Sequence, residues 1–174
     1  PREIWDADEV RRALRAALPD INRQRLEKVL RGERRGFVIA GLTPDGLDHI
    51  GFACSGSEAN DMVVRLVRHY WRLLGKPGKR TIISRTMAYH GSTVMGASLG
   101  GMPHVHAMDG QLEPDVSHIE HPHWYVHGGD LSRDEFGLKA ARALETRILE
   151  LGAENVAAFI GEPVQGAGGV IDPP

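Results

Sequence analysis

The chain has 174 residues, of which 41% are hydrophobic and 25% are charged, and its formal net charge is -2. These values suit a globular protein with a core, and the near-neutral charge gives no overall electrostatic case for nucleic-acid binding. The single cysteine, Cys54, excludes an internal disulfide framework, and no apolar run is long enough to span a membrane. The polar start is unlike a signal peptide, so we expect a cytoplasmic protein.

Two helices are predicted near the start, over residues 7–18 and 22–31, because apolar residues recur at helical spacing. Many arginines and few acids lie between Arg11 and Arg35. Such a segment suits a surface that faces nucleic acid or a membrane, but it also suits an ordinary solvated helix face. We favour the solvated face.

After residue 35 the pattern alternates between apolar runs and amphipathic runs. A turn is expected at Pro44 and a loop over 101–117, with a short helix within 90–100. Residues 36–42 are a short apolar run. Strands are expected at residues 50–55, 81–84 and 155–164, and long helices at 57–75 and 132–152. This alternation predicts an α/β fold, a three-layer sandwich in which helices cover both faces of a mostly parallel sheet.

Both long helices carry local signals of their own. The first has an apolar stripe that we expect to face the core, formed by Ala59, Val63, Leu66, Val67, Tyr70 and Leu74. The second begins at Ser132, where Glu135 completes a capping box, and it ends at Gly152.

Three glycine-containing motifs, "SGSEAND", "YHGST" and "EPVQGAGG", fall where strands of this sheet should end. Ligands bind beyond the carboxyl ends of such strands, so the motifs predict one site built from three loops. In the first motif Gly56 allows close approach, and Ser57 opens a helix whose free N–H groups favour an anion such as phosphate. The alternative is a plain serine-capped helix.

The other two motifs add an aromatic ring and an acid. Tyr89 could stack on a flat ring and His90 could donate to it, although an ordinary turn would have the same sequence. Glu162 ends an apolar strand, where a carboxylate needs a cation or a hydrogen-bond donor. A structural ion pair would meet that need as well as a ligand would.

Three segments together resemble the class III pyridoxal-phosphate-dependent aminotransferases: "GLDHIGFACSGSEAND", "RTIISRTMAYHGSTVMGASLGG" and "NVAAFIGEPVQGAGGVIDPP". The connecting "HPHWYVHGGD" resembles the branch that acts on ω-amino acids, amines and polyamines with pyruvate or another keto acid. The resemblance runs from Leu42 to Pro174. It implies that residues 42–174 are part of the pyridoxal-phosphate-binding large domain of fold type I. Residues 1–41 are a helical segment that this resemblance does not explain.

The resemblance implies a role for each matching residue, with pyridoxal 5′-phosphate as the cofactor. Gly56 and Ser57 would hold the phosphate, and Glu162 would lie near the pyridine ring. The residues expected to shape the face of that ring are Tyr89, His90 and Gly91. Asn60 and Asp61 would serve helix packing and the subunit interface, while Gln165 would lead the chain onward. The partners implied are an amine donor, a keto acid acceptor and a second subunit in a homodimer, with no nucleic acid and no membrane.

The chemistry also needs a Schiff-base lysine and an acid that keeps the pyridine nitrogen protonated. The resemblance puts both beyond Pro174, and we expect the chain to be a fragment. Its lysines lie in polar helical stretches or beside a turn, namely Lys28, Lys76, Lys79 and Lys139. We therefore predict that this chain alone does not transaminate.

Three other readings stay open. Histidine pairs and their neighbours could bind zinc: His104, His106, His118, His121, His123 and His127. The arginine-rich start could instead make the chain a non-enzymatic nucleic-acid-binding module. The chain could also be a misassembled gene product in which a foreign segment precedes half of an aminotransferase domain.

Overall fold

The computed structural model describes residues 44, 47, 49–109 and 113–174. The chain divides into two units, Pro1–Phe52 and Ala53–Pro174, which are described separately. The predicted helices at 7–18 and 22–31 and the apolar run at 36–42 lie outside the described residues. In the first unit the Leu47 N–H donates to the Pro44 carbonyl over 3.1 Å. This is the i to i+3 bond of the predicted turn.

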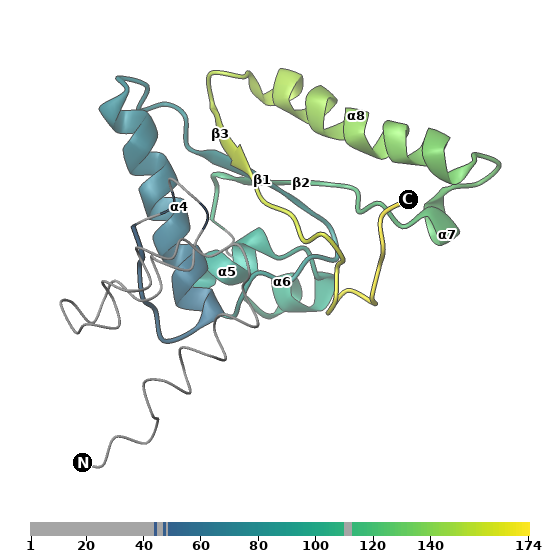
Figure 1. Ribbon diagram of the computed structural model, residues 1–174, viewed down its shortest axis with the longest axis horizontal. Coiled ribbons are helices and arrows are strands. Elements are labelled where there is room, and N and C mark those ends of the chain that lie inside the picture. Colours follow the sequence, from purple (N-terminus) through teal and green to yellow (C-terminus); the bar gives the residue numbers. More distant parts are fainter. Residues whose placement is uncertain (1–43, 45–46, 48, 110–112) are drawn as a thin grey trace, which may run out of the picture. The chain divides into compact units, whose positions relative to one another are not determined.

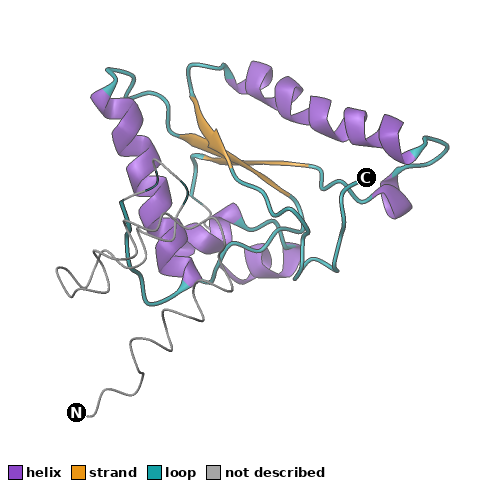
Figure 2. Cartoon of the chain, viewed as in Figure 1, coloured by secondary structure: helices purple, strands orange, loops and turns teal. Residues whose placement is uncertain are grey.

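The second unit contains a three-stranded parallel sheet in the order β2-β1-β3. The central strand is β1 (Thr81–Arg85), flanked by β2 (Val116–Ile119) and β3 (Val156–Phe159). The strands are drawn in orange in Figure 2. The β1 strand contains the predicted run 81–84, and β3 is the observed part of the predicted run 155–164. All carboxyl ends of the strands therefore meet at one edge of the sheet.

Helices cover both faces of this sheet, as the sequence predicts. On one face Ile82 packs with Val64 of α4 (Gly56–Leu73) and Leu99 of α5 (Val94–Leu99). On the other face Ile83 packs against Leu144 and Ile148 of α8 (Arg133–Leu151). Neighbouring strand residues point to opposite faces, so the Ile82–Ile83 pair feeds both cores. Figure 1 shows α8 on one side of the strands and α4 with α5 on the other.

The capping box predicted for α8 is confirmed. The Glu135 N–H donates to the Ser132 hydroxyl over 3.3 Å, and the Ser132 N–H donates to the Glu135 carboxylate over 2.9 Å. These bonds lower the pKa of Glu135 from its ordinary value, because they favour the ionised carboxylate. Gly152 ends the helix with a φ of 80°, a conformation that favours glycine.

The predicted apolar stripe of α4 is wrong at most of its positions. Four of its residues are exposed: Val63, Leu66, Tyr70 and Leu74. The buried residue is Val64, at 3% exposure, and Val67 packs beside it. The Trp71 indole N–H donates to the Ala157 carbonyl over 2.8 Å. The face that contacts the sheet is therefore 64, 67 and 71, which includes a polar donor.

Two further predictions are wrong. Residues 50–55 form no strand: the Ser55 backbone is extended, but no described residue forms a ladder with this run. Residues 101–117 are not a loop throughout, because they contain α6 (Pro103–Asp109) and the start of β2. Proline suits the first position of a helix, which was the missed signal. One turn of helix, α7 (Trp124–His127), follows β2. None of the helices within the described residues is both long and apolar enough to cross a bilayer.

Candidate functional site

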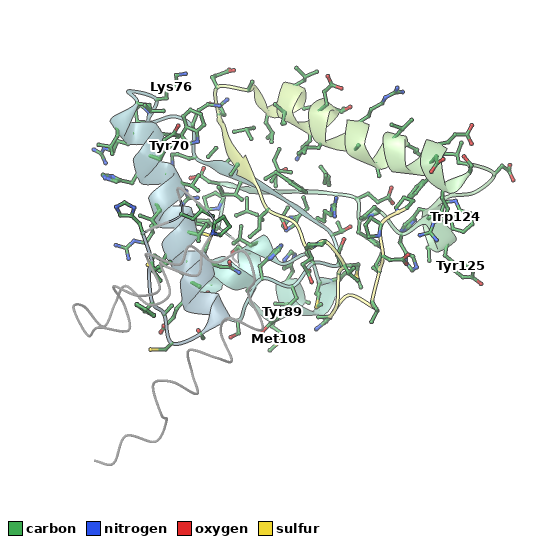
Figure 3. The ribbon with its side chains drawn as sticks, in the orientation of Figure 1. Tyr70, Lys76, Tyr89, Met108, Trp124 and Tyr125 are labelled. Atoms are coloured by element: carbon green, nitrogen blue, oxygen red, sulfur yellow. The ribbon has the colours of Figure 1, made fainter. Side chains whose placement is uncertain are left out.

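The three glycine-containing motifs meet at one end of the sheet. The first is the amino end of α4, the second is the loop that follows β1, and the third is the turn that follows β3. Hydrogen bonds join the second motif to both of the others. Tyr89, half exposed, lies in the second motif, on the side of the molecule where α5 packs (Figure 3). The structure thus brings the predicted site residues together.

The amino end of α4 offers free hydrogen-bond donors. Ser55 caps the helix by accepting from the Glu58 N–H over 3.2 Å, and the Glu58 carboxylate accepts from the Cys54 N–H over 2.8 Å. The N–H groups of Gly56 and Ser57 have no acceptor among the described residues. A β-carbon added at Gly56 would meet no atom within 4 Å. The helix end is therefore open, with two donors and the positive end of the helix dipole available to an anion.

Gly91 packs directly on this helix end. The Ser57 hydroxyl oxygen accepts from the Ser92 N–H over 3.1 Å, which leaves its own hydrogen free to donate. Gly91 has a φ of +126°, and a β-carbon there would lie 2.7 Å from the Ser57 oxygen. Only glycine fits at this position, for both conformational and steric reasons. The hydroxyl of Ser57 is thus held between the helix end and the loop of the second motif.

Two residues in the second turn of α4 hold the loop in place. The Asn60 side-chain amide donates to the His90 carbonyl over 2.7 Å. The Asp61 carboxylate accepts from the Thr93 hydroxyl over 2.7 Å, and Thr93 in turn caps α5. The expected role of Asn60 and Asp61 in packing is therefore observed, and its target is the loop. Their role at a subunit interface stays a prediction.

Glu162 links the second and third motifs. Its carboxylate accepts from the Tyr89 N–H over 2.9 Å and from the Gly166 N–H over 3.1 Å. Two backbone N–H groups thus supply the hydrogen-bond donors that this carboxylate needs. Glu162 forms no ion pair with any described residue. The arrangement fixes the loop backbone beneath the Tyr89 ring.

His90 is buried, with 7% exposure, and its Nε2 atom has no hydrogen-bond partner among the described residues. Burial lowers the pKa of His90 from its ordinary value. Nearby Glu162 opposes that effect, and His118 adds to it. The imidazole therefore favours its neutral form near pH 7. A neutral ring with one unpaired nitrogen can donate to or accept from a ligand, depending on its tautomer.

Gln165 is the most buried polar side chain of the third motif, with 1% exposure. Its amide nitrogen donates to the Thr86 carbonyl over 3.0 Å, and its backbone pairs with Ile171. Its side-chain oxygen is buried without a partner among the described residues. Gln165 therefore ties the turn after β3 to the end of β1, as well as leading the chain onward.

The described lysines lie away from this site. Lys79 donates to the carbonyls of Ala153 and Val156 over 2.6 and 2.8 Å, at the amino end of β3. Lys76 lies near the same end of the sheet, with its ammonium 5.7 Å from the Trp71 ring centre. Lys139 is on α8. Lys28 lies outside the described residues.

The histidines are not arranged as the zinc-binding hypothesis requires. His104 and His106 lie in helix α6, where residues two apart point about 200° apart rather than to one face. The rings of His106 and His118 both contact the Gly100 carbonyl, at 2.7 and 2.8 Å. Among the residues that the structure describes, no group of three or more possible ligands could hold a metal ion.

The site as a whole combines an open helix end with a half-exposed aromatic ring and a buried histidine. Such a set suits a ligand that carries a phosphate and a flat ring, at the carboxyl end of a parallel sheet. These features define an α/β protein with a candidate site for a ligand that carries a phosphate. The chain belongs to the class III aminotransferases, because the model of that family matches residues 15–174. The match begins before Leu42, so it corrects the expected extent of the resemblance.

Individual relatives agree with the family. The chain is 57% identical over 137 residues to the putrescine–pyruvate aminotransferase of Pseudomonas aeruginosa, covering 79% of this chain and 30% of that protein. It is 46% identical over 138 residues to a probable γ-aminobutyrate transaminase 3 of Oryza sativa, covering 79% and 27%. The ω-transaminase of Pseudomonas jessenii in complex with PMP is similar in structure, with a TM-score of 0.68 and 46% identity, covering 70% and 27%.

These matches also show how much of a whole aminotransferase the chain covers. It spans less than a third of the length of the relatives that it matches. Class III aminotransferases use pyridoxal 5′-phosphate, and the Pseudomonas jessenii structure holds a form of that cofactor. The predicted fold, part of a pyridoxal-phosphate transferase large domain, is confirmed by these structures.

Proposed function

We propose that this chain is the part of an aminotransferase that holds the cofactor phosphate and one face of its ring. The observation that carries the proposal is the open amino end of α4. There Gly56 and Ser57 present a hydroxyl and two N–H groups that have no acceptor among the described residues. Donors of this kind at a helix N-terminus are the groups that bind phosphate oxygens. The reaction we propose for the whole protein moves an amino group from an amine or ω-amino acid to a keto acid such as pyruvate.

Each residue of the chain would act on the bound cofactor through its own contacts. Gly56 and Ser57 would bind the phosphate, and Gly91 would leave room for Ser57 to do so. Tyr89 would stack on the ring, and neutral His90 would lie behind it. When bound, pyridoxal phosphate supplies an electron sink that stabilises the carbanion left when the amine carbon loses its proton.

Glu162 would act by positioning rather than by proton transfer. Both of its carboxylate oxygens are already occupied by backbone N–H groups, at 2.9 and 3.1 Å. It therefore holds the Tyr89 backbone in the position from which the ring can reach the cofactor. Loss of the carboxylate would loosen the ring contact.

We propose further that the chain alone does not transaminate, since a lysine that bonds to the cofactor has to reach the same end of the sheet. Lys76 and Lys79 lie at the opposite end of the strands, and Lys139 is on α8. We also propose that the intact protein is a homodimer of the cytoplasm, on the basis of the family resemblance and the single cysteine.

The reaction is tested by incubating the chain with putrescine, pyruvate and pyridoxal phosphate and measuring alanine by chromatography. We expect no alanine above the level made by the cofactor alone. Turnover at about 1 s⁻¹ or faster, a normal enzyme rate, would contradict the lysine argument. Sequencing the gene on both sides of this segment tests the proposal that the lysine and the acid belong to a longer protein. We expect a strand bearing an aspartate and then a lysine after residue 174, and a product that does form alanine.

A further inference from the structure

A strongly basic groove lies beside the second half of α4, away from the proposed cofactor site. It has a volume of about 750 Å³ and is lined by Arg65, Arg68 and Arg72 of α4 and by Arg80, which directly precedes β1. Arg80 stands at the amino end of β1, whereas the cofactor site is at the carboxyl end. Tyr70 and Lys76 mark this end of the molecule in Figure 3.

The spacing of the α4 arginines puts them on one side of the helix. Positions 65, 68 and 72 follow the i, i+3, i+7 pattern of a single helix face. Like charges this close repel each other, so the helix is less stable with them than with neutral residues. Two acids offset part of the charge. Arg68 lies 3.2 Å from Glu113, and Arg80 lies 2.8 Å from Asp115.

Positive charge remains after these pairs are formed. The side chains of Arg65 and Arg72 make no hydrogen bond or ion pair with any described residue. Four guanidinium groups and two carboxylates leave a net charge of +2 in the groove. The Nη2 atom of Arg68 is buried and has no hydrogen-bond partner among the described residues, its nearest carboxylate oxygen being 3.6 Å away on Asp115. A buried donor without a close acceptor is unfavourable, so the groove is stabilised incompletely by its own acids.

We propose that this groove binds a small molecule with a chain of two or more phosphate groups. Guanidinium groups bind phosphate oxygens through paired N–H donors, and the two unpaired arginines stand two helical turns apart, about 10.5 Å along the axis. Their long side chains can close on a phosphate chain between them. His69 also lines the groove. The apolar part of the lining is Met62, Leu66 and Pro77, so an organic group attached to the phosphates would find apolar contact. A nucleoside triphosphate therefore binds more tightly than bare tripolyphosphate.

The test is a calorimetric titration of the full chain with tripolyphosphate and with ATP. The Arg65→Gln/Arg72→Gln chain is expected to lose affinity for both by more than about tenfold, since two charged donors are removed. Arg142→Gln is the matched control, because Arg142 is an exposed arginine on α8 and also has no partner among the described residues. Far-UV circular dichroism checks that each variant folds.

A second variant separates this groove from the cofactor site. Gly56→Asp puts a carboxylate into open space at the helix end, where it repels phosphate. It is expected to leave tripolyphosphate binding to the groove unchanged. The proposal is overturned if tripolyphosphate does not bind, if Arg65→Gln/Arg72→Gln binds it as tightly as the original chain, or if Gly56→Asp is the variant that loses it. Equal affinity for ATP and tripolyphosphate would overturn the role of the apolar lining.

Discussion

Gly91→Ala is expected to destabilise the chain and to weaken cofactor binding together. An alanine at a φ of +126° is strained by about 1–3 kcal/mol. Its β-carbon would also lie 2.7 Å from the Ser57 hydroxyl oxygen and 2.9 Å from the Ser57 backbone. Overpacking of this kind adds about 1–3 kcal/mol, so the expected total is about 2–6 kcal/mol. Relief of the clash would move Ser92 away from Ser57 and break the bond between them.

The assay is urea unfolding followed by tryptophan fluorescence, with Gly78→Ala as the control. A β-carbon at Gly78 would meet no atom within 4 Å, and Gly78 has no positive φ. We expect the control to lie within about 0.5 kcal/mol of the original chain. If Gly91→Ala is no less stable than the control, or if it binds pyridoxamine 5′-phosphate as tightly as the original chain, then Ser57 and Gly91 are not packed as described.

Three further predictions concern stability. Val64→Ala should lower the free energy of unfolding in urea by about 2 kcal/mol. Val63→Ala, at an exposed position, should change this free energy by less than about 0.5 kcal/mol. Equal effects would contradict the observed buried face of α4. Glu162→Ala should destabilise the chain by about 1–3 kcal/mol, because both acceptors of the backbone N–H groups are lost. Glu162→Gln should destabilise it less, since the amide oxygen can still accept one hydrogen bond. The reverse order would contradict the role of both carboxylate oxygens as acceptors. Burial lowers the pKa of His90 in the folded chain, so the unfolded chain binds the proton of this residue more readily. The free energy of unfolding should therefore fall as the pH drops below about 6.5. The contribution of His90 to this fall is at most about 1.4 kcal/mol per pH unit. Urea unfolding at pH 7.5 and at pH 5.5 measures how the free energy of unfolding changes with pH. This change should be smaller in the His90→Asn variant. An equal change in both chains would mean that His90 does not cause it.

The helix ends were predictable because their signals are local. Ser132, Glu135 and Gly152 lie within or beside the helix that they cap, and the structure has each of these contacts or conformations. The buried face of α4 was not predictable in the same way. The helix is apolar on two sides, one with Val64 and the other with Leu66. Only the position of the sheet decides which side is buried.

The convergence of the site was predictable from the topology, and its fine structure was not. The carboxyl ends of parallel strands meet at one edge, so Tyr89 and Glu162 had to lie near each other. The bond from Asn60 to the His90 carbonyl joins residues 30 positions apart. A signal was nevertheless present, since Asn60 and Asp61 follow Ser57 by three and four positions and thus share its side of the helix.

The phosphate site is tested most directly by titrating the full chain with pyridoxamine 5′-phosphate, and with pyridoxamine as the control without phosphate. Neither compound has an aldehyde, so neither can bond to surface lysines. We expect saturable binding of the phosphorylated compound alone. We expect Gly56→Asp to abolish that binding, and Gly56→Asn, which has the same shape without the charge, to retain most of it. Equal binding of the two compounds, or full binding by Gly56→Asp, would contradict a cofactor-phosphate site at the amino end of α4.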